Sequence, residues 1–235
     1  YYLNFTTDQF VDAPATLTFG TDASSILPYA VSTEGEIESE SRAVFGHLQY
    51  QLNDELSITA GLRYTEDERE LRDHLNYDSF GILLPAFGVE DASVSLNQTF
   101  PELASQDFEN YSANLQFDWT PADDLLVYAG YTRGHKAGNF ALPLGGYINA
   151  AFGDLSDLER MPHDEEVLHS YEIGLKWSSQ SFSVNAAAFY YDYQDYQAFT
   201  FEGLSSQIGN IDAEVTGAEL EVAFAPTDRL ELRLG

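Results

Sequence analysis

The stretch LSITAGLRYT, residues 56–65, decides the fold because apolar and polar residues alternate along it without a break. Its apolar positions are Leu56, Ile58, Ala60, Leu62 and Tyr64. Successive side chains of a β-strand point to opposite faces, so a period of two predicts a strand with one apolar and one polar face. The polar face includes Arg63, and a charged side chain there indicates that this face meets water.

The same alternation recurs along the chain and predicts a succession of strands. It is clear at residues 44–52, 111–119, 170–177 and 217–224, and weaker at 125–133 and 182–193. Short alternating pieces at 1–4 and 230–235 complete the set. Charged residues also lie on the polar faces of these strands, among them Asp118, Glu172, Lys176, Glu219 and Glu221. We therefore predict about eight to nine strands of about ten residues, each with one face in hydrocarbon and the other in water.

The connections between these strands alternate in length. Short ones are expected at 53–54, 120–124, 178–180 and 225–228, and long ones at 5–40, 66–109, 134–167 and 195–212. Short periplasmic turns and long extracellular loops are typical of outer-membrane barrels, whereas a soluble sandwich has no reason to sort its loops in this way. Aromatic residues near strand ends, such as Trp119 and Trp177, suit the girdles of such a barrel. The predicted fold is all-β: part of a transmembrane antiparallel up-and-down β-barrel.

On this reading, alternate residues of each strand divide between lipid and lumen. The residues predicted to face lipid are Leu62, Leu115, Phe117, Leu175 and Leu220. Those predicted to face the lumen are Arg63, Gln116, Lys176 and Glu219.

Composition excludes several classes of function. Ten Lys and Arg against 39 Asp and Glu give a net charge of −29, which repels phosphate backbones, so we expect no nucleic-acid partner. The chain has no cysteine, hence no disulfide, thiol nucleophile or thiolate zinc site. No apolar run approaches the roughly 20 residues that a membrane-spanning helix needs.

No catalytic or metal-binding pattern is apparent. A Gly-x-Ser-x-Gly segment is missing, and the histidines lack metal-ligand spacing. Acidic runs at 66–70 and 163–166 are candidates for cation binding, although solvated charge is the simpler interpretation. We therefore expect no enzyme activity, no cofactor and no metal site.

One segment, RGHKAGNF at 133–140, resembles the Gly-Phe-Lys-Ala-Gly-Gly-Phe-like segment that ends a barrel strand in TonB-dependent receptors. Four further pieces are similar to the same family in the same order. They are FGHL at 45–48 leading to TAGLRYTE at 59–66, SYEIGLK at 170–176, AAFYYDY at 187–193, and GN at 209–210 through GAELE at 217–221. Five ordered pieces at the spacing of the strands make the resemblance specific from about residue 43 onward.

The resemblance implies an outer-membrane active transporter of a Gram-negative bacterium for a scarce nutrient, often an iron–siderophore complex. In this family the TonB complex acts on an N-terminal plug domain. We therefore expect residues 1–235 to be part of a barrel domain, with the plug and the C-terminal strands outside this sequence. The expected partners are outer-membrane lipid, the plug, the TonB complex and a small ligand. Two alternatives stay open: a passive porin, and a soluble acidic carbohydrate-binding β-protein.

Cationic and aromatic residues near the outer ends of strands are the candidates for ligand contact. A cation at an acidic mouth could attract an anionic chelate, and aromatic rings could cover an apolar part of it. The alternatives are ion pairs inside the lumen and a loop that packs on itself. The candidate residues are Arg63, Arg133, Lys136, Phe140, Tyr147 and Phe152.

Overall fold

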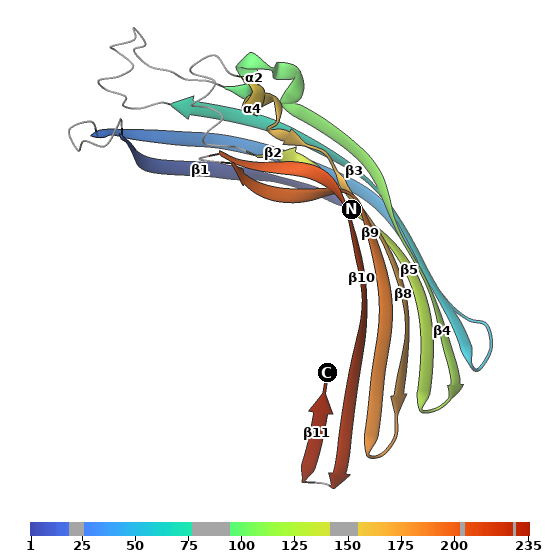
Figure 1. Ribbon diagram of the computed structural model, residues 1–235. Coiled ribbons are helices and arrows are strands. Elements are labelled where there is room, and N and C mark those ends of the chain that lie inside the picture. Colours follow the sequence, from blue (N-terminus) through green and yellow to red (C-terminus); the bar gives the residue numbers. More distant parts are fainter. Residues whose placement is uncertain (19–25, 77–94, 142–154, 203–204, 228) are drawn as a thin grey trace.

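The computed structural model describes residues 1–18, 26–76, 95–141, 155–202, 205–227 and 229–235 (Figure 1). Nine strands form one sheet in the order β1-β2-β3-β4-β5-β8-β9-β10-β11, and every neighbouring pair is antiparallel. This order is the sequence order apart from β6 and β7, which pair with each other in a separate two-stranded sheet. The up-and-down arrangement and the number of strands predicted from the sequence are confirmed.

The strands are long and the helices short. The large sheet consists of β1 Tyr2–Thr18, β2 Ile26–Gln51, β3 Leu56–Asn76, β4 Ser105–Ala122, β5 Leu125–Lys136, β8 Glu166–Ser178, β9 Phe182–Glu202, β10 Ser205–Thr227 and β11 Leu230–Leu234. The small elements are α2 Leu96–Thr99, η2 Pro101–Leu103, β6 Asn139–Phe140, α4 Ser156–Glu159 and β7 Pro162–His163. Within the described ranges, no helix is long and apolar enough to cross a membrane.

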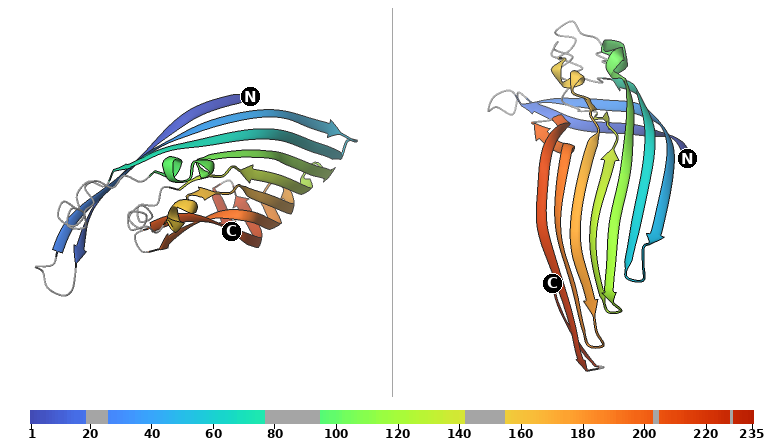
Figure 2. Two further views of the ribbon diagram at one scale, coloured as in Figure 1. Left: turned by 90° about the horizontal axis from the view of Figure 1, so that it is seen from above. Right: turned by 90° about the vertical axis from the view of Figure 1, so that its right-hand side faces the viewer.

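The sheet is strongly curved, with β1 at one edge and β11 at the other (Figures 1 and 2). Tight connections join β2 to β3, β4 to β5, β8 to β9 and β10 to β11 at one end of the sheet, which we call the turn end. The helices α2 and α4 lie at the opposite end, which we call the loop end. The short connections therefore lie at one end as predicted, but the connection from β9 to β10 at the loop end is also short.

The register gives the sheet one apolar and one polar face. In β3 and β4, Leu62 lies opposite Ala113 and Ile58 opposite Phe117, whereas Arg63 lies opposite Ser112. The apolar face is open: Leu62 is 59% exposed and Phe117 is 43% exposed. Such a broad exposed apolar face in a soluble protein would drive aggregation, so we assign it to lipid and call it the outward face. The polar face is then the inward, lumen face.

A row of tyrosines closes the apolar band towards the loop end. Tyr64 lies opposite Tyr111, and Tyr131, Tyr171 and Tyr190 lie opposite one another on three successive strands. The ring centroids of Tyr131 and Tyr171 are 5.1 Å apart, and those of Tyr171 and Tyr190 are 6.2 Å apart. We call these five residues the tyrosine row; it has the position of an interfacial girdle.

A second aromatic row closes the band at the turn end. The indole Nε1 of Trp177 donates to Asp124 at 2.9 Å, and that of Trp119 donates to Glu55 at 3.5 Å. Trp119 and Tyr111 are eight residues apart on β4, or roughly 25 Å along the strand at about 3.3 Å per residue. With the tilt of about 35–45° that barrel strands have, this length corresponds to a height of roughly 20 Å, close to the apolar band of about 25 Å in membrane barrels.

Two of the predicted long loops are wrong, because residues 5–40 and 195–212 belong largely to strands. Beyond the tyrosine row, β2 and β3 still alternate, but the outward positions are mainly acidic instead of apolar; those of β3 are exposed and those of β2 are half-buried. Ile37 and Leu71 lie opposite each other on the inward face and are buried, while Glu38 and Glu70 lie opposite each other on the outward face. Glu36, Glu38 and Glu40 on β2 and Glu66, Glu68 and Glu70 on β3 therefore belong to the outward face of strands that continue past the apolar band, whereas Asp67 is buried on the inward face.

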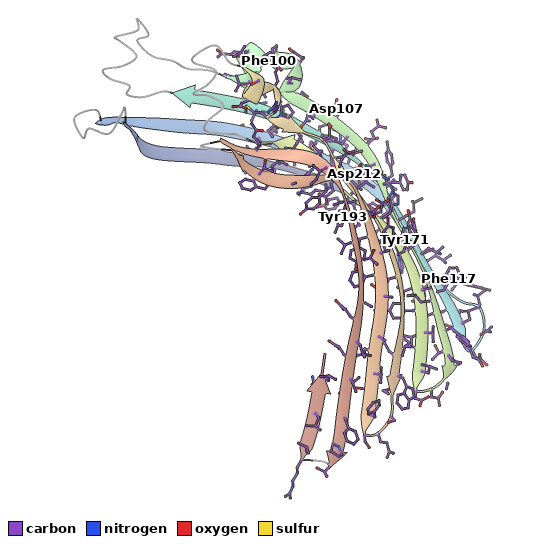
Figure 3. All side chains as sticks on the ribbon, in the orientation of Figure 1. Phe100, Asp107, Phe117, Tyr171, Tyr193 and Asp212 are labelled. Carbon is purple, nitrogen blue, oxygen red and sulfur yellow. The ribbon has the colours of Figure 1, made fainter. Side chains whose placement is uncertain are left out.

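The hairpin of β9 and β10 bends where the register shifts between Ile211 and Ala213. Asp195 has a φ of 54°, in the left-handed region, and its backbone N–H donates to Asp212 at 3.3 Å. The side-chain amide of Asn210 donates to the carbonyl oxygen of Asp195 at 2.8 Å. Figure 3 labels Asp212 close to this bend. An irregularity of this kind turns the strands without ending their pairing.

Candidate functional site

Two connections fold onto the inward face at the loop end, and we call them the loop layer: residues 95–104 and 137–165, as far as they are described. The first is joined to β3, since the N–H of Leu71 donates to the carbonyl oxygen of Ala104 at 2.8 Å. The second encloses the side chains of Leu158 and Met161, which are fully buried. The loop layer gives this end of the sheet a small core of its own.

Side-chain amides from β9 and β10 fasten the second connection of the loop layer. The Nε2 of Gln197 donates to the carbonyl oxygens of Ala137 at 3.1 Å and Asp164 at 3.0 Å. Asn210 pairs with the backbone of Asp164 in both directions, at 2.9 and 3.1 Å. Each amide replaces a strand neighbour that the loop backbone lacks, so the two described ends of this connection are held together beside the sheet.

Gly138 lies in close contact with another part of the loop layer and with the sheet. A Cβ at this position would lie 2.2 Å from the carbonyl oxygen of His163 and 2.4 Å from the ring of Phe108 on β4. The amide of Gln106 on β4 also donates to that His163 oxygen, at 3.4 Å. Gly138 is therefore required by close packing between the start of the loop, its end and the sheet.

Arg63 lies on the inward face, as predicted, beside a hollow of about 400 Å³. Its guanidinium lies 5.5 Å from the ring centroid of Tyr1 and 5.9 Å from that of Phe45, and its Nε donates to Thr65 at 3.1 Å. Small residues, including Gly61, line the hollow. Among the described residues, the terminal nitrogens of Arg63 have no hydrogen-bond partner, so they are free to meet an anion in the lumen.

Arg133 lies on the opposite face of the sheet from Arg63. By strand alternation it shares the outward face of Tyr131, and it lies opposite Ala113 and His169. Its guanidinium stacks over the ring of Tyr111 at 4.0 Å. The guanidinium of Arg133 thus lies beside the tyrosine row, although Arg133 also borders the hollow next to Arg63; ligand contact by Arg133 stays a prediction.

The remaining candidates lie in or near the loop layer. Lys136 is exposed at the end of β5, opposite Glu166. Phe140 is 3% exposed and pairs through its backbone with Pro162, so its ring belongs to the packing of the loop itself. Tyr147 and Phe152 lie outside the described residues. Lys136 is thus the candidate from this segment that meets solvent at the mouth.

The loop layer also contains a buried imidazole with a shifted pKa. Burial lowers the pKa of His163 below its ordinary value, and the nearby charge of Lys136 lowers it further. A depressed histidine pKa means that the unfolded loop binds a proton more readily than the folded loop. The stability that this histidine contributes is therefore present above about pH 6.5 and is lost as the pH falls towards the folded-state value.

We accordingly expect the loop layer to open more readily in mild acid. Amide hydrogen exchange of residues 137–141 should accelerate between about pH 6.5 and 5 after correction for the intrinsic rate. The variant His163→Gln should show a weaker dependence, although His135, whose pKa burial also lowers, keeps part of it. Protection that does not change with pH in the unaltered protein would contradict this expectation.

In the part of the chain that the structure describes, no group of three or more His, Asp or Glu side chains is placed to hold a metal ion. The sequence did not predict the role of the side-chain amides Gln106, Gln197 and Asn210, because neutral polar residues in segments predicted as loops form no recognisable motif. Their signal becomes visible only when the strands that carry them are known to reach the loop layer.

The fold and the two aromatic rows define a class of protein: the wall of a membrane-spanning β-barrel whose lumen is polar. The model of the family described as "TonB dependent receptor-like, beta-barrel" matches residues 1–235. The chain belongs to this family. The resemblance inferred from the strand motifs is thus confirmed.

Individual relatives agree with the family. The Pesticin receptor of Yersinia pestis is 25% identical over 203 residues, which are 85% of this chain and 26% of that protein. The chain therefore spans about a quarter of the length of this curated relative. Among solved structures, the ferric yersiniabactin uptake receptor FyuA from Yersinia pestis has a TM-score of 0.60 at 17% identity, over 97% of this chain and 30% of that one. The copper transporter OprC has a TM-score of 0.62 at 14% identity, over 97% and 37%. These two structures support the fold.

Proposed function

We propose that the protein to which this chain belongs is an outer-membrane receptor and active transporter of a Gram-negative bacterium, with an iron–siderophore complex as its ligand. The family supports transport coupled to TonB. The name of FyuA, a ferric yersiniabactin uptake receptor, and that of the Fiu structure, a ferric-catecholate import receptor, support the class of ligand. A plug domain and the TonB complex are the partners that this proposal requires.

The observation that carries the proposal is the ordered loop layer over a polar lumen. Selective binding needs fixed groups at the mouth, and Gln197 and Asn210 hold the connection from β5 to β8 in place there. Arg63 below it and Lys136 beside it are cations in a strongly acidic chain. An anionic chelate whose carboxylate or catecholate oxygens meet these cations would suit this arrangement.

The experiment that tests the proposal is growth under iron limitation. A strain that lacks the gene should fail to grow on an iron-loaded siderophore as the iron source, and the restored gene should rescue it. Rescue should also require TonB. A passive porin, the alternative left open by the sequence, predicts uptake that persists without TonB. Normal growth of the deletion strain on every siderophore tested would overturn the choice of ligand.

A further inference from the structure

Arg133 and His169 form a pair on the outward face. They lie directly opposite each other on β5 and β8, one position beyond the tyrosine pair Tyr131 and Tyr171. Side chains directly opposite on one face of an antiparallel pair lie within reach of each other. Both residues can present N–H groups, and neither belongs to the inward face where the transported ligand is proposed to bind.

Both side chains are held by aromatic neighbours. The guanidinium of Arg133 stacks over the ring of Tyr111 at 4.0 Å and donates to Asn110 at 2.5 Å. The Nδ1 of His169 is hydrogen-bonded to the hydroxyl of Tyr131 at 2.9 Å, and their rings stack at 6.0 Å. The same nitrogen of Arg133 also donates to the carbonyl oxygen of Tyr111, so the second terminal nitrogen of Arg133 and the Nε2 of His169 have no hydrogen-bond partner among the described residues. Groups fixed in this way lose little entropy when they bind an anion.

The height of Arg133 and His169 on the barrel determines which part of the lipid they would contact. The tyrosine row marks the level of the lipid head groups, so a residue one position beyond it lies among the head-group phosphates. Apart from Arg42, which is paired with Glu40, the described outward face at this level is mainly acidic: Glu66 and Glu109 lie opposite each other on β3 and β4, and Asp192 and Glu214 on β9 and β10. Those carboxylates repel phosphate, and because Asp192 lies directly opposite His169 on β9, an approaching phosphate is directed to the Arg133 side of the pair.

We propose that Arg133 and His169 form a binding site for a head-group phosphate of the outer-leaflet lipid. Guanidinium groups bind phosphate with two parallel hydrogen bonds, and the imidazole supplies a third donor beside them. The inference rests on the proposed location in the outer membrane, but it is independent of what the receptor transports. It assigns to Arg133 a lipid contact in place of the ligand contact expected from the sequence.

The test is lipid binding by the purified full-length receptor in detergent. Lipid A with both phosphates is titrated, and bound lipid is counted by native mass spectrometry. Arg133→Gln should weaken binding about tenfold, the loss expected for about one charge-assisted hydrogen bond. Lipid A without phosphates should bind the unaltered receptor as weakly as intact lipid A binds Arg133→Gln. This second measurement does not depend on how well the variant folds.

Arg42→Gln is the matched control. Arg42 also lies on the outward face, opposite Glu66, but it is paired with Glu40 at 2.5 Å and should contribute little to lipid binding. Equal affinity of Arg133→Gln and the unaltered receptor, or an equal loss in Arg42→Gln, would overturn the phosphate site. So would equal affinity for lipid A with and without phosphates. Failure of siderophore transport would instead count against the proposed function, and the lipid measurement would not change.

Discussion

Replacement of Leu115 by arginine is expected to destabilise the full barrel by about 2–4 kcal/mol, the cost of a cationic side chain in the middle of the lipid-facing band. Leu115 lies on the outward face, opposite Ala60 on one side and Tyr131 on the other. It is four residues from both Trp119 and Tyr111, the two ends of the band on β4. A guanidinium there cannot reach either interface without distortion. The free energy of unfolding, measured by reversible denaturation in lipid vesicles, gives the value.

Gln116→Arg is the control for that measurement, because it introduces the same side chain one position along the strand. Gln116 lies on the inward face, opposite Thr59, and its amide donates to Asp118 at 2.7 Å. An arginine there stays among polar groups and next to an acid, so we expect a loss well below that of Leu115→Arg. If both variants lost the same stability, the assignment of the two faces would be wrong.

The apolar band was predictable because its chemistry varies with the same period as its backbone. Alternation between Leu and Ser or between Phe and Gln shows both that a segment is a strand and which side meets lipid. Residues 56–65 and 111–119 have this pattern, and the structure confirms their faces and their direct pairing. No tertiary information was needed, since lipid takes the place of a protein core on the outward side.

Beyond the band the same reasoning failed, for a physical reason. At Glu36, Glu38 and Glu40 the outward side meets water, so acids replace apolar residues, while Ile37 and Ser39 between them remain buried beneath other parts of the protein. The period of two was still visible in GEIESES. This pattern does not by itself indicate a strand, because a segment with one charged face and one small mixed face resembles a solvated run.

For the candidate cations, the sequence alone could have predicted the face of the sheet on which each one lies. Arg133 is in phase with Val127, Ala129 and Tyr131, which all lie on the outward face, so the alternation itself placed it towards lipid. Arg63 is in phase with Thr59 and Gly61, on the inward face. Both arginines lie near the outer end of a strand, which made both candidates for ligand contact. Their positions in the apolar–polar alternation place them on opposite faces of the sheet. The side-chain amides that hold the loop layer, Gln197 and Asn210, could not be predicted from the sequence, because their role depends on contacts between distant segments.

Gly138→Ala is expected to open the loop layer and with it to reduce ligand affinity. The added Cβ would meet a backbone oxygen of His163 and the ring of Phe108, and a carbonyl in a paired strand cannot move away as a flexible side chain can. Overpacking of this kind costs about 1–3 kcal/mol. Amide exchange of residues 137–141 should therefore accelerate roughly tenfold to a hundredfold, since about 1.4 kcal/mol corresponds to a factor of ten.

Gly134→Ala, four residues earlier, separates close packing from the mere loss of a glycine. A Cβ at Gly134 would meet no protein atom within 4 Å, so this variant should leave the exchange rates unchanged; because Gly134 borders the hollow beside Arg63, exchange is the readout on which it serves as the control. Heat-resistant migration of the barrel should survive in both variants, because neither change touches the apolar band. If Gly138→Ala opened the loop layer but left affinity for the ferric siderophore intact, binding would have to be assigned to groups outside residues 137–165. If it changed neither, the contact between Gly138 and His163 would not hold the loop.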